Sequence, residues 1–184
     1  MYLLNDYDYN LEKIIKKGCR KTNRTGVDTL SLFGLQGRYR IDTHFPIPTK
    51  RKYAYRSIFA ELLWMLSGST NVNDLEAMNS KIWSAWRDKA FEERNGYVDG
   101  ELGPIYGWQF RHFGADYKTH RYAPGNFGIY QVAYVVDELK NNKYSRRIMI
   151  NLWNPPDVLS DTVRLPPCHY SSQFIYTVMF QLTV

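Results

Sequence analysis

Residues 55–68, "YRSIFAELLWMLSG", constrain the fold most, because this segment has the apolar content and the period of a helix with one buried face. Ile58, Leu62 and Met65 recur at helical spacing and form one apolar stripe, and the closing glycine is a typical helix end. Glu61 lies three residues after Ile58 and four before Met65, so it projects into the same stripe. A carboxylate is unfavourable on an apolar helix face, so we expect Glu61 to have a specific role.

The rest of the chain alternates between helical and strand patterns. Further helices are predicted over residues 11–17 (ended by Gly18), 73–82 and 130–140. Strands are predicted over residues 30–41 (with a change of phase at Gly34), 146–153 and 173–184. Two other stretches are irregular: residues 87–100 form a polar excursion, and the glycine-rich residues 100–114 form a tightly packed loop. This alternation predicts the α/β (α+β) class.

We expect one domain over residues 1–184, because the chain has no internal repeat and no linker-like stretch. The chain stops at Val184 inside an apolar strand pattern, which predicts a domain that is incomplete at its C-terminus. There are only two cysteines, the N-terminal residues do not resemble a signal peptide, and no run reaches membrane-spanning length. We therefore expect a reducing, intracellular setting.

The net charge of +6 favours an anionic partner, although basic clusters are most often a solvated face. Nucleic acid, phosphate esters and polyanionic cofactors all remain open from charge alone. Charge therefore selects a class of partner and no single ligand.

Cys168 follows two prolines in "LPPCHY", residues 165–170. The prolines remove backbone donors and favour extended geometry, so we expect Cys168 at a rigid turn that enters a strand. A nucleophile held at a fixed angle fits this position, and a buried structural cysteine is the plainer alternative. Cys19, set among lysines and arginines, fits a surface or packing role.

Three arginines are candidates to lower the pKa of a thiol or to bind a phosphate: Arg24, Arg146 and Arg147. Adjacent residues of a strand point to opposite faces, so Arg146 and Arg147 can serve one anion only at an irregular strand start or across an interface. This geometry suggests a dimer.

Five stretches of the chain, in this order, resemble the signature blocks of the thymidylate synthase family. They are "NRTGVDTLSLFG", "RSIFAELLWMLSGSTNV", "GELGPIYGWQFRHFGADY", "SRRIMINLWNP" and "LPPCHY". The resemblance runs from about Arg24 to the end of the chain, and the loop over residues 83–100 is more similar to the eukaryotic or viral form. It departs from the family pattern at Arg51, Lys52 and Ala54, where the family has residues that contact the folate tail.

The resemblance implies reductive methylation of dUMP to dTMP with 5,10-methylenetetrahydrofolate as the co-substrate. Cys168 matches the family nucleophile that adds to carbon 6 of the pyrimidine, and a thiolate suits this addition because it is both a good nucleophile and a good leaving group. Glu61 would relay protons to the pyrimidine carbonyl through water, with an ion pair to an arginine as the alternative. Tyr106 matches the tyrosine that assists proton removal from carbon 5, with a packed aromatic ring as the alternative.

The remaining site residues implied by the resemblance bind the two substrates. Arg24 of one subunit, with Arg146 and Arg147 of the other, would bind the dUMP phosphate. Ile82 and Trp83 would flank the pterin ring of the folate, and both have a plain core position as the alternative. His169 and Asn154 would have supporting roles near dUMP.

For the fold, the resemblance implies a large mixed β-sheet with helices on one face, and a cytoplasmic homodimer made by sheets packed back to back. No metal is expected, because the sequence shows no metal-ligand cluster. Three alternatives stay open: a dUMP or dCMP hydroxymethylase of the same fold, a truncated inactive copy, and a basic nucleic-acid-binding module, which we rank low.

Overall fold

The computed structural model describes four stretches of the chain: residues 5–41, 45–119, 127–176 and 182–183. The contacts divide the chain into two compact units, one formed by Met1–Lys52 with Ile175–Val184 and the other by Tyr53–Phe174. The single domain expected over residues 1–184 stays a prediction.

The first unit contains one helix and short antiparallel strand pairs. Its elements are α1 (Asn5–Lys17), β1 (Cys19–Lys21), β2 (Thr29–Ser31), β3 (Arg38–Tyr39) and β6 (Leu182–Thr183). Strand β1 pairs with β2, and β3 pairs with β6. The predicted first helix is confirmed, and the chain leaves it at Gly18.

The continuous strand predicted over residues 30–41 is wrong. The segment is interrupted between β2 and β3, and Gly34 there has a φ of 78°, which breaks extended geometry. Two polar contacts hold the chain after this break against α1: Asp6 accepts the backbone N–H of Arg38 at 2.8 Å, and Asn10 donates to the carbonyl of Gln36 at 3.1 Å.

Arg24 lies in the turn between β1 and β2, and its side chain is exposed. The side chain of Asn23 shapes this turn, because it accepts the N–H of Thr25 at 2.8 Å and donates to the carbonyl of Val27 at 2.8 Å. Cys19 is exposed in β1, which fits the surface role of the two roles left open for it.

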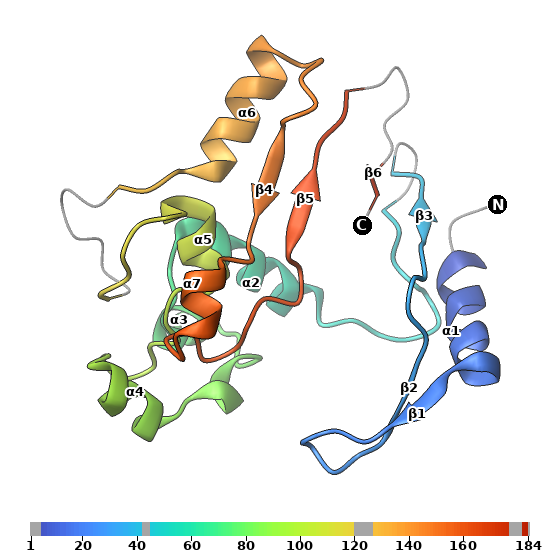
Figure 1. The fold of residues 1–184 in the computed structure, drawn as a ribbon, viewed down its shortest axis with the longest axis horizontal. Coiled ribbons are helices and arrows are strands. Elements are labelled where there is room, and N and C mark those ends of the chain that lie inside the picture. Colours follow the sequence, from blue (N-terminus) through green and yellow to red (C-terminus); the bar gives the residue numbers. More distant parts are fainter. Residues whose placement is uncertain (1–4, 42–44, 120–126, 177–181, 184) are drawn as a thin grey trace. The chain divides into compact units, whose positions relative to one another are not determined.

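The second unit carries most of the helices (Figure 1). Its elements are α2 (Tyr55–Ser67), α3 (Val72–Ala77), the 3₁₀ turn η1 (Ser84–Trp86), α4 (Lys89–Asn95), α5 (Tyr106–His112), α6 (Gln131–Asn141), β4 (Met149–Asn151), α7 (Pro155–Leu159) and β5 (Ser171–Gln173). Its core gathers apolar side chains from α2, α3, α5, α6 and β4 around Trp64, which is 1% exposed.

The helix predicted over residues 55–68 is confirmed, and Gly68 caps it in the left-handed conformation. The predicted buried stripe is wrong, because Ile58 and Leu62 are 46% and 47% exposed. The helix instead buries Ala60 and Trp64, and it packs on α5.

The helix predicted over residues 73–82 is also wrong in both boundaries. Helix α3 starts one residue earlier, at Val72, because the side chain of Asn71 accepts the N–H of Asn73 at 2.8 Å and so caps it. It ends at Ala77, and Asn79 follows with a φ of 59°. Ile82 therefore lies outside a helix.

Three helices of the described residues were missed by the sequence analysis: α4, α5 and the short α7, which begins at Pro155. In the predicted polar excursion, Asp88 caps α4 by accepting the N–H of Phe91 at 3.1 Å. In the predicted irregular loop, the tight packing is confirmed, since Glu101–Gln109 are all buried, but Tyr106–His112 form α5.

Helix α6 confirms the helix predicted over residues 130–140. The alternation predicted for residues 146–153 is confirmed too, because Ile148, Ile150 and Leu152 are buried and Met149 is exposed. The continuous strand predicted over residues 173–184 is wrong: β5 ends at Gln173, residues 174–176 are not in a strand, and Leu182–Thr183 form β6. Residues 177–181 and 184 lie outside the described residues.

The described residues form helices and antiparallel strand pairs, β1 with β2, β3 with β6 and β4 with β5. This arrangement supports a mixed α and β fold, and the large mixed sheet stays a prediction. Within the described stretches, no helix has the length and apolarity needed to cross a membrane.

Replacing Gly107 by Ala is expected to destabilise the protein by about 1–3 kcal/mol, because a Cβ there would meet the carbonyl oxygen of Ser69 at 2.1 Å. Helix α5 would have to move away from the end of α2. Urea unfolding measures the loss. Ala90→Ser, which adds an atom at an exposed position of α4, is the control and should change stability by less than about 0.5 kcal/mol. An equal effect of both changes would contradict this close approach.

Candidate active site

The hydroxyl of Tyr106 binds the backbone of Cys168, the predicted nucleophile. It accepts the backbone N–H of Cys168 at 2.7 Å and, more weakly, the N–H of His169 at 3.4 Å. Tyr106 begins α5 and is 5% exposed, whereas Cys168 is exposed in a bend that follows the buried Pro167 and leads to β5. The predicted position of Cys168 at a turn before a strand is therefore confirmed.

The surroundings of Tyr106 keep its hydroxyl protonated. Burial raises the pKa of Tyr106, the two backbone N–H groups lower it, and the charge and the side-chain hydrogen bond of Cys168 raise it again. Because the oxygen already accepts two N–H groups, its own proton remains available to the sulfur. A protonated hydroxyl beside a thiol can stabilise the thiolate by a hydrogen bond, or it can take part in a proton transfer.

Glu61 and Trp83 are linked to Tyr106 by a ring contact of Trp83. The indole Nε1 of Trp83 donates to the Glu61 carboxylate at 2.5 Å. The Trp83 ring lies edge-on to Tyr106 with centroids 6.2 Å apart, and 5.6 Å from Trp64. The structure thus brings Glu61, Trp83 and Tyr106 together with Cys168, from segments far apart in the sequence. For Glu61, where an ion pair with arginine was the alternative, the contact observed is the Trp83 indole.

The two residues predicted to flank the pterin differ in exposure. Trp83 is 6% exposed and belongs to the core, which fits its alternative reading as a core residue. Ile82 is 46% exposed beside it, so its side chain offers apolar surface to a planar ring. Both roles stay predictions.

His169 and Asn154 lie in different surroundings. The His169 ring is exposed, with its centroid 6.0 Å from that of Tyr106, so it stands beside the predicted nucleophile. Asn154 precedes α7 and donates to the Asp157 carboxylate at 2.7 Å, which also accepts from Gln109 at 2.7 Å. Burial raises the pKa of Asp157. Asn154 therefore contacts the polar link between α7 and α5.

The sequence analysis missed this link. Gln109 is 1% exposed and donates to the carbonyl of Pro104 at 2.9 Å as well as to Asp157, and its side-chain oxygen has no partner among the described residues. The one signal available was its position three residues after Tyr106, on the same side of α5.

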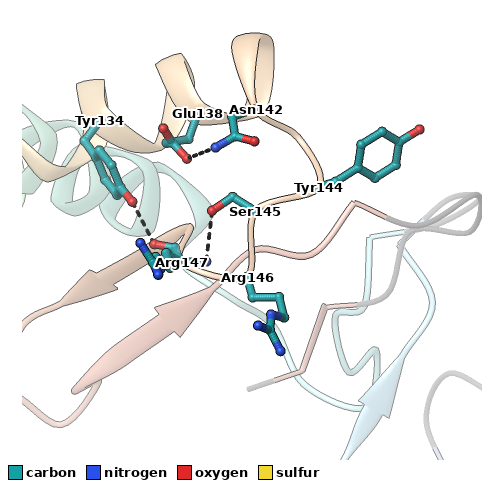
Figure 2. A pocket seen from close by; sticks show the side chains of 7 residues that line it. All are labelled: Tyr134, Glu138, Asn142, Tyr144, Ser145, Arg146 and Arg147. Carbon is teal, nitrogen blue, oxygen red and sulfur yellow. Dashed lines mark hydrogen bonds between the residues drawn. The ribbon is translucent and has the colours of Figure 1, made fainter.

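Arg146 and Arg147 line a separate pocket of about 480 Å³ between the end of α6 and the start of β4. Figure 2 shows their two guanidinium groups pointing in different directions. The turn is fixed by its backbone, because Tyr134 donates to the carbonyl of Arg147 at 2.8 Å and the N–H of Arg147 donates to Ser145 at 3.1 Å. Neither Cys168 nor Tyr106 lines this pocket.

The chain matches a sequence profile described as thymidylate synthase over residues 5–184. It is 43% identical over 171 residues to the thymidylate synthase of Varicella-zoster virus (strain Dumas), covering 91% of this chain and 56% of that protein. It is 40% identical over 176 residues to the Bos taurus enzyme of the same name and 39% identical over 176 residues to the Homo sapiens one, covering 94% of this chain and 49% and 55% of those proteins.

The chain thus spans about half the length of the curated relatives it matches. These relatives are viral and mammalian, as the resemblance predicted. The profile match over nearly all of the sequence shows that this chain belongs to the thymidylate synthase family.

Proposed function

We propose that this protein takes part in the reductive methylation of dUMP to dTMP, with 5,10-methylenetetrahydrofolate as co-substrate. The observation that carries the proposal is the exposed Cys168 whose backbone N–H is held by the buried hydroxyl of Tyr106. Family membership supports the reaction class, and this geometry supports Cys168 as the nucleophile.

In the proposed reaction the Cys168 thiolate adds to carbon 6 of the pyrimidine and leaves again at the end. Tyr106 holds the cysteine segment in place, and its hydroxyl helps to position the removal of the proton from carbon 5. Glu61, fixed by the Trp83 indole, exchanges protons with the pyrimidine carbonyl through water. Ile82 is the exposed apolar residue that would face the pterin ring, with Trp83 supporting it from the core.

The proposal is tested by the products formed by the natural polypeptide that contains this chain. With dUMP and methylenetetrahydrofolate we expect dTMP and dihydrofolate in equal amounts, and no reaction with dCMP. A hydroxymethylated pyrimidine without dihydrofolate would show the hydroxymethylase instead. No product from either nucleotide would favour the inactive copy.

We also propose a homodimer in which sheets pack back to back and helices cover the other sheet faces. One observation in its support is the ladder of β4 and β5, which buries Ile150 on one side and exposes Met149 on the other. The pocket lined by Arg146 and Arg147 includes neither Cys168 nor Tyr106, which supports the idea that this pair serves the phosphate site of the other subunit, together with Arg24 of that subunit. The cytoplasmic location is part of the same proposal.

Arg146→Ala and Arg147→Ala are each expected to raise the KM for dUMP about tenfold or more, because each removes a charge-assisted hydrogen bond to the phosphate. Steady-state kinetics measure the change. Lys140→Ala, at an exposed position of α6, is the matched control and should leave KM within about twofold.

Mixing subunits tests which site the pair serves. With dUMP near the wild-type KM, the Arg146→Ala/Arg147→Ala double variant and Cys168→Ser should each be nearly inactive alone. Mixed in equal amounts, they should recover about a quarter of the wild-type activity, because half of the dimers then hold one intact site of two. Lack of recovery in dimers shown to exchange subunits would place the arginine pair at its own subunit's site.

A further inference from the structure

Arg164 is a junction between three segments, and the sequence analysis gave it no role. We call residues 82–88, 102–106 and 164–169 the three site segments, because they carry Trp83, Tyr106 and Cys168. The backbone N–H of Arg164 donates to the carbonyl of Leu102 at 3.0 Å, which connects the segment of Cys168 to that of Tyr106.

The side chain of Arg164 makes the second connection. Its Nε donates to the carbonyl of Trp86 at 3.1 Å, and its Nη2 lies 3.1 Å from the Asp88 carboxylate. Its guanidinium carbon lies 5.9 Å from the ring centroid of Trp86 and 6.0 Å from that of Phe91. A planar guanidinium can satisfy a carbonyl, a carboxylate and an aromatic surface at the same time, which a lysine ammonium cannot.

The ion pair is partly shielded from water, since the side chains of Arg164 and Asp88 are 29% and 36% exposed. Asp88 is itself fixed, because it caps α4 by accepting the N–H of Phe91. Arg164 is therefore fixed at two groups. Its guanidinium binds Asp88, the N-cap of α4, and its backbone N–H binds the carbonyl of Leu102.

We infer that Arg164 is a positioning residue that keeps Cys168 in its place beside Tyr106 and Trp83. This inference rests on the proposed function for its effect on catalysis, but its structural effect can be measured independently. Without the guanidinium, residues 164–169 lose their side-chain contacts to Trp86 and Asp88, and the 2.7 Å contact between Cys168 and Tyr106 should open more often.

The test compares Arg164→Met and Asp88→Asn with a matched control, Arg94→Met. Asp88→Asn removes the charge that pairs with Arg164 and keeps a good helix cap, so it provides the test if Arg164→Met does not fold. Arg94 also makes an ion pair, with Asp161 at 3.0 Å, and lies 5.8 Å from the Phe91 ring, but both partners of that pair lie outside the three site segments.

The first measurement is amide hydrogen exchange in residues 165–172, with residues 149–151 of β4 as the internal reference. Arg164→Met and Asp88→Asn should speed exchange in residues 165–172 about tenfold relative to β4, and Arg94→Met should not. The inference would be overturned if both test variants exchanged at the wild-type rate in residues 165–172. It would also be overturned if Arg94→Met raised that rate equally, or if the rate in β4 rose by the same factor.

The second measurement is steady-state kinetics on the natural polypeptide. Both test variants should lower kcat about tenfold while the KM for dUMP stays within about threefold, because misplacement of a reacting group affects the chemical step more than binding. Arg164→Lys should fall between the wild type and Arg164→Met, since it keeps only the charge opposite Asp88. An unchanged kcat in Arg164→Met and Asp88→Asn would also overturn the inference.

The two measurements separate this inference from the proposed function. If the wild type makes no dTMP but the exchange pattern changes as expected, the proposed function fails and the junction at Arg164 stands. If the wild type is active and the variants match it in both measurements, only the inference about Arg164 fails.

Discussion

Replacing Cys168 by Ser is expected to lower the rate of dTMP formation by at least about a thousandfold, because the covalent route depends on one nucleophile. A serine hydroxyl fits the same space, but it ionises far less at neutral pH than a thiol and is a poorer leaving group. The bend after Pro167 and the contact with Tyr106 should persist, so the loss reflects chemistry rather than folding.

Cys19→Ser is the control for this prediction. Cys19 is exposed in β1, and no role in the reaction is proposed for it. Its replacement should leave the rate within about twofold of the wild type. Retention of activity in Cys168→Ser, or an equal loss in Cys19→Ser, would remove Cys168 from the mechanism.

Replacing Tyr106 by Phe is expected to lower kcat about a hundredfold, the lower range for a positioned proton-transfer group. The change leaves the N–H groups of Cys168 and His169 without their acceptor and removes the proton available to the sulfur. Because the pKa of Tyr106 lies above its ordinary value, the wild-type hydroxyl stays protonated throughout the neutral range in which the rates are compared.

Tyr97→Phe is a matched control, because it also removes a partly buried tyrosine hydroxyl. The Tyr97 hydroxyl donates to the carbonyl of Thr162 at 3.2 Å, away from Cys168, and burial raises its pKa to about 12. Both variants should lose a similar free energy of unfolding, about 1 kcal/mol, while only Tyr106→Phe loses kcat. Equal effects on kcat would make Tyr106 a packing residue.

The sequence predicted those elements whose pattern is set locally. Helices α2 and α6 and the alternation around Ile150 followed from periodicity alone. Helix α5 was missed because it is buried on nearly all sides, so Tyr106 to Gln109 show no amphipathic period. Helix α4 was missed because Glu92, which looks like a surface residue, is buried and accepts the N–H of Gly100 at 2.8 Å.

The candidate site was likewise predicted only in part. Cys168 and Tyr106 were predicted from the resemblance to the family, and the structure brings them into contact. The hydrogen bond from Trp83 to Glu61 and the junction at Arg164 join segments that are far apart in the sequence, and no spacing in the sequence signals such contacts. The stripe of Ile58 and Leu62 was predicted correctly as a pattern and wrongly as the buried face, because α2 buries Ala60 and Trp64 in the core instead.

The most direct test of the central claim is the mass of the natural polypeptide after incubation with 5-fluoro-dUMP and methylenetetrahydrofolate, followed by peptide mapping. We predict a covalent adduct that carries both compounds, that maps to the peptide containing Cys168, and that is absent from Cys168→Ser. A wild-type mass that stays unchanged, or an adduct on any other residue, would contradict the assignment of Cys168 as the nucleophile.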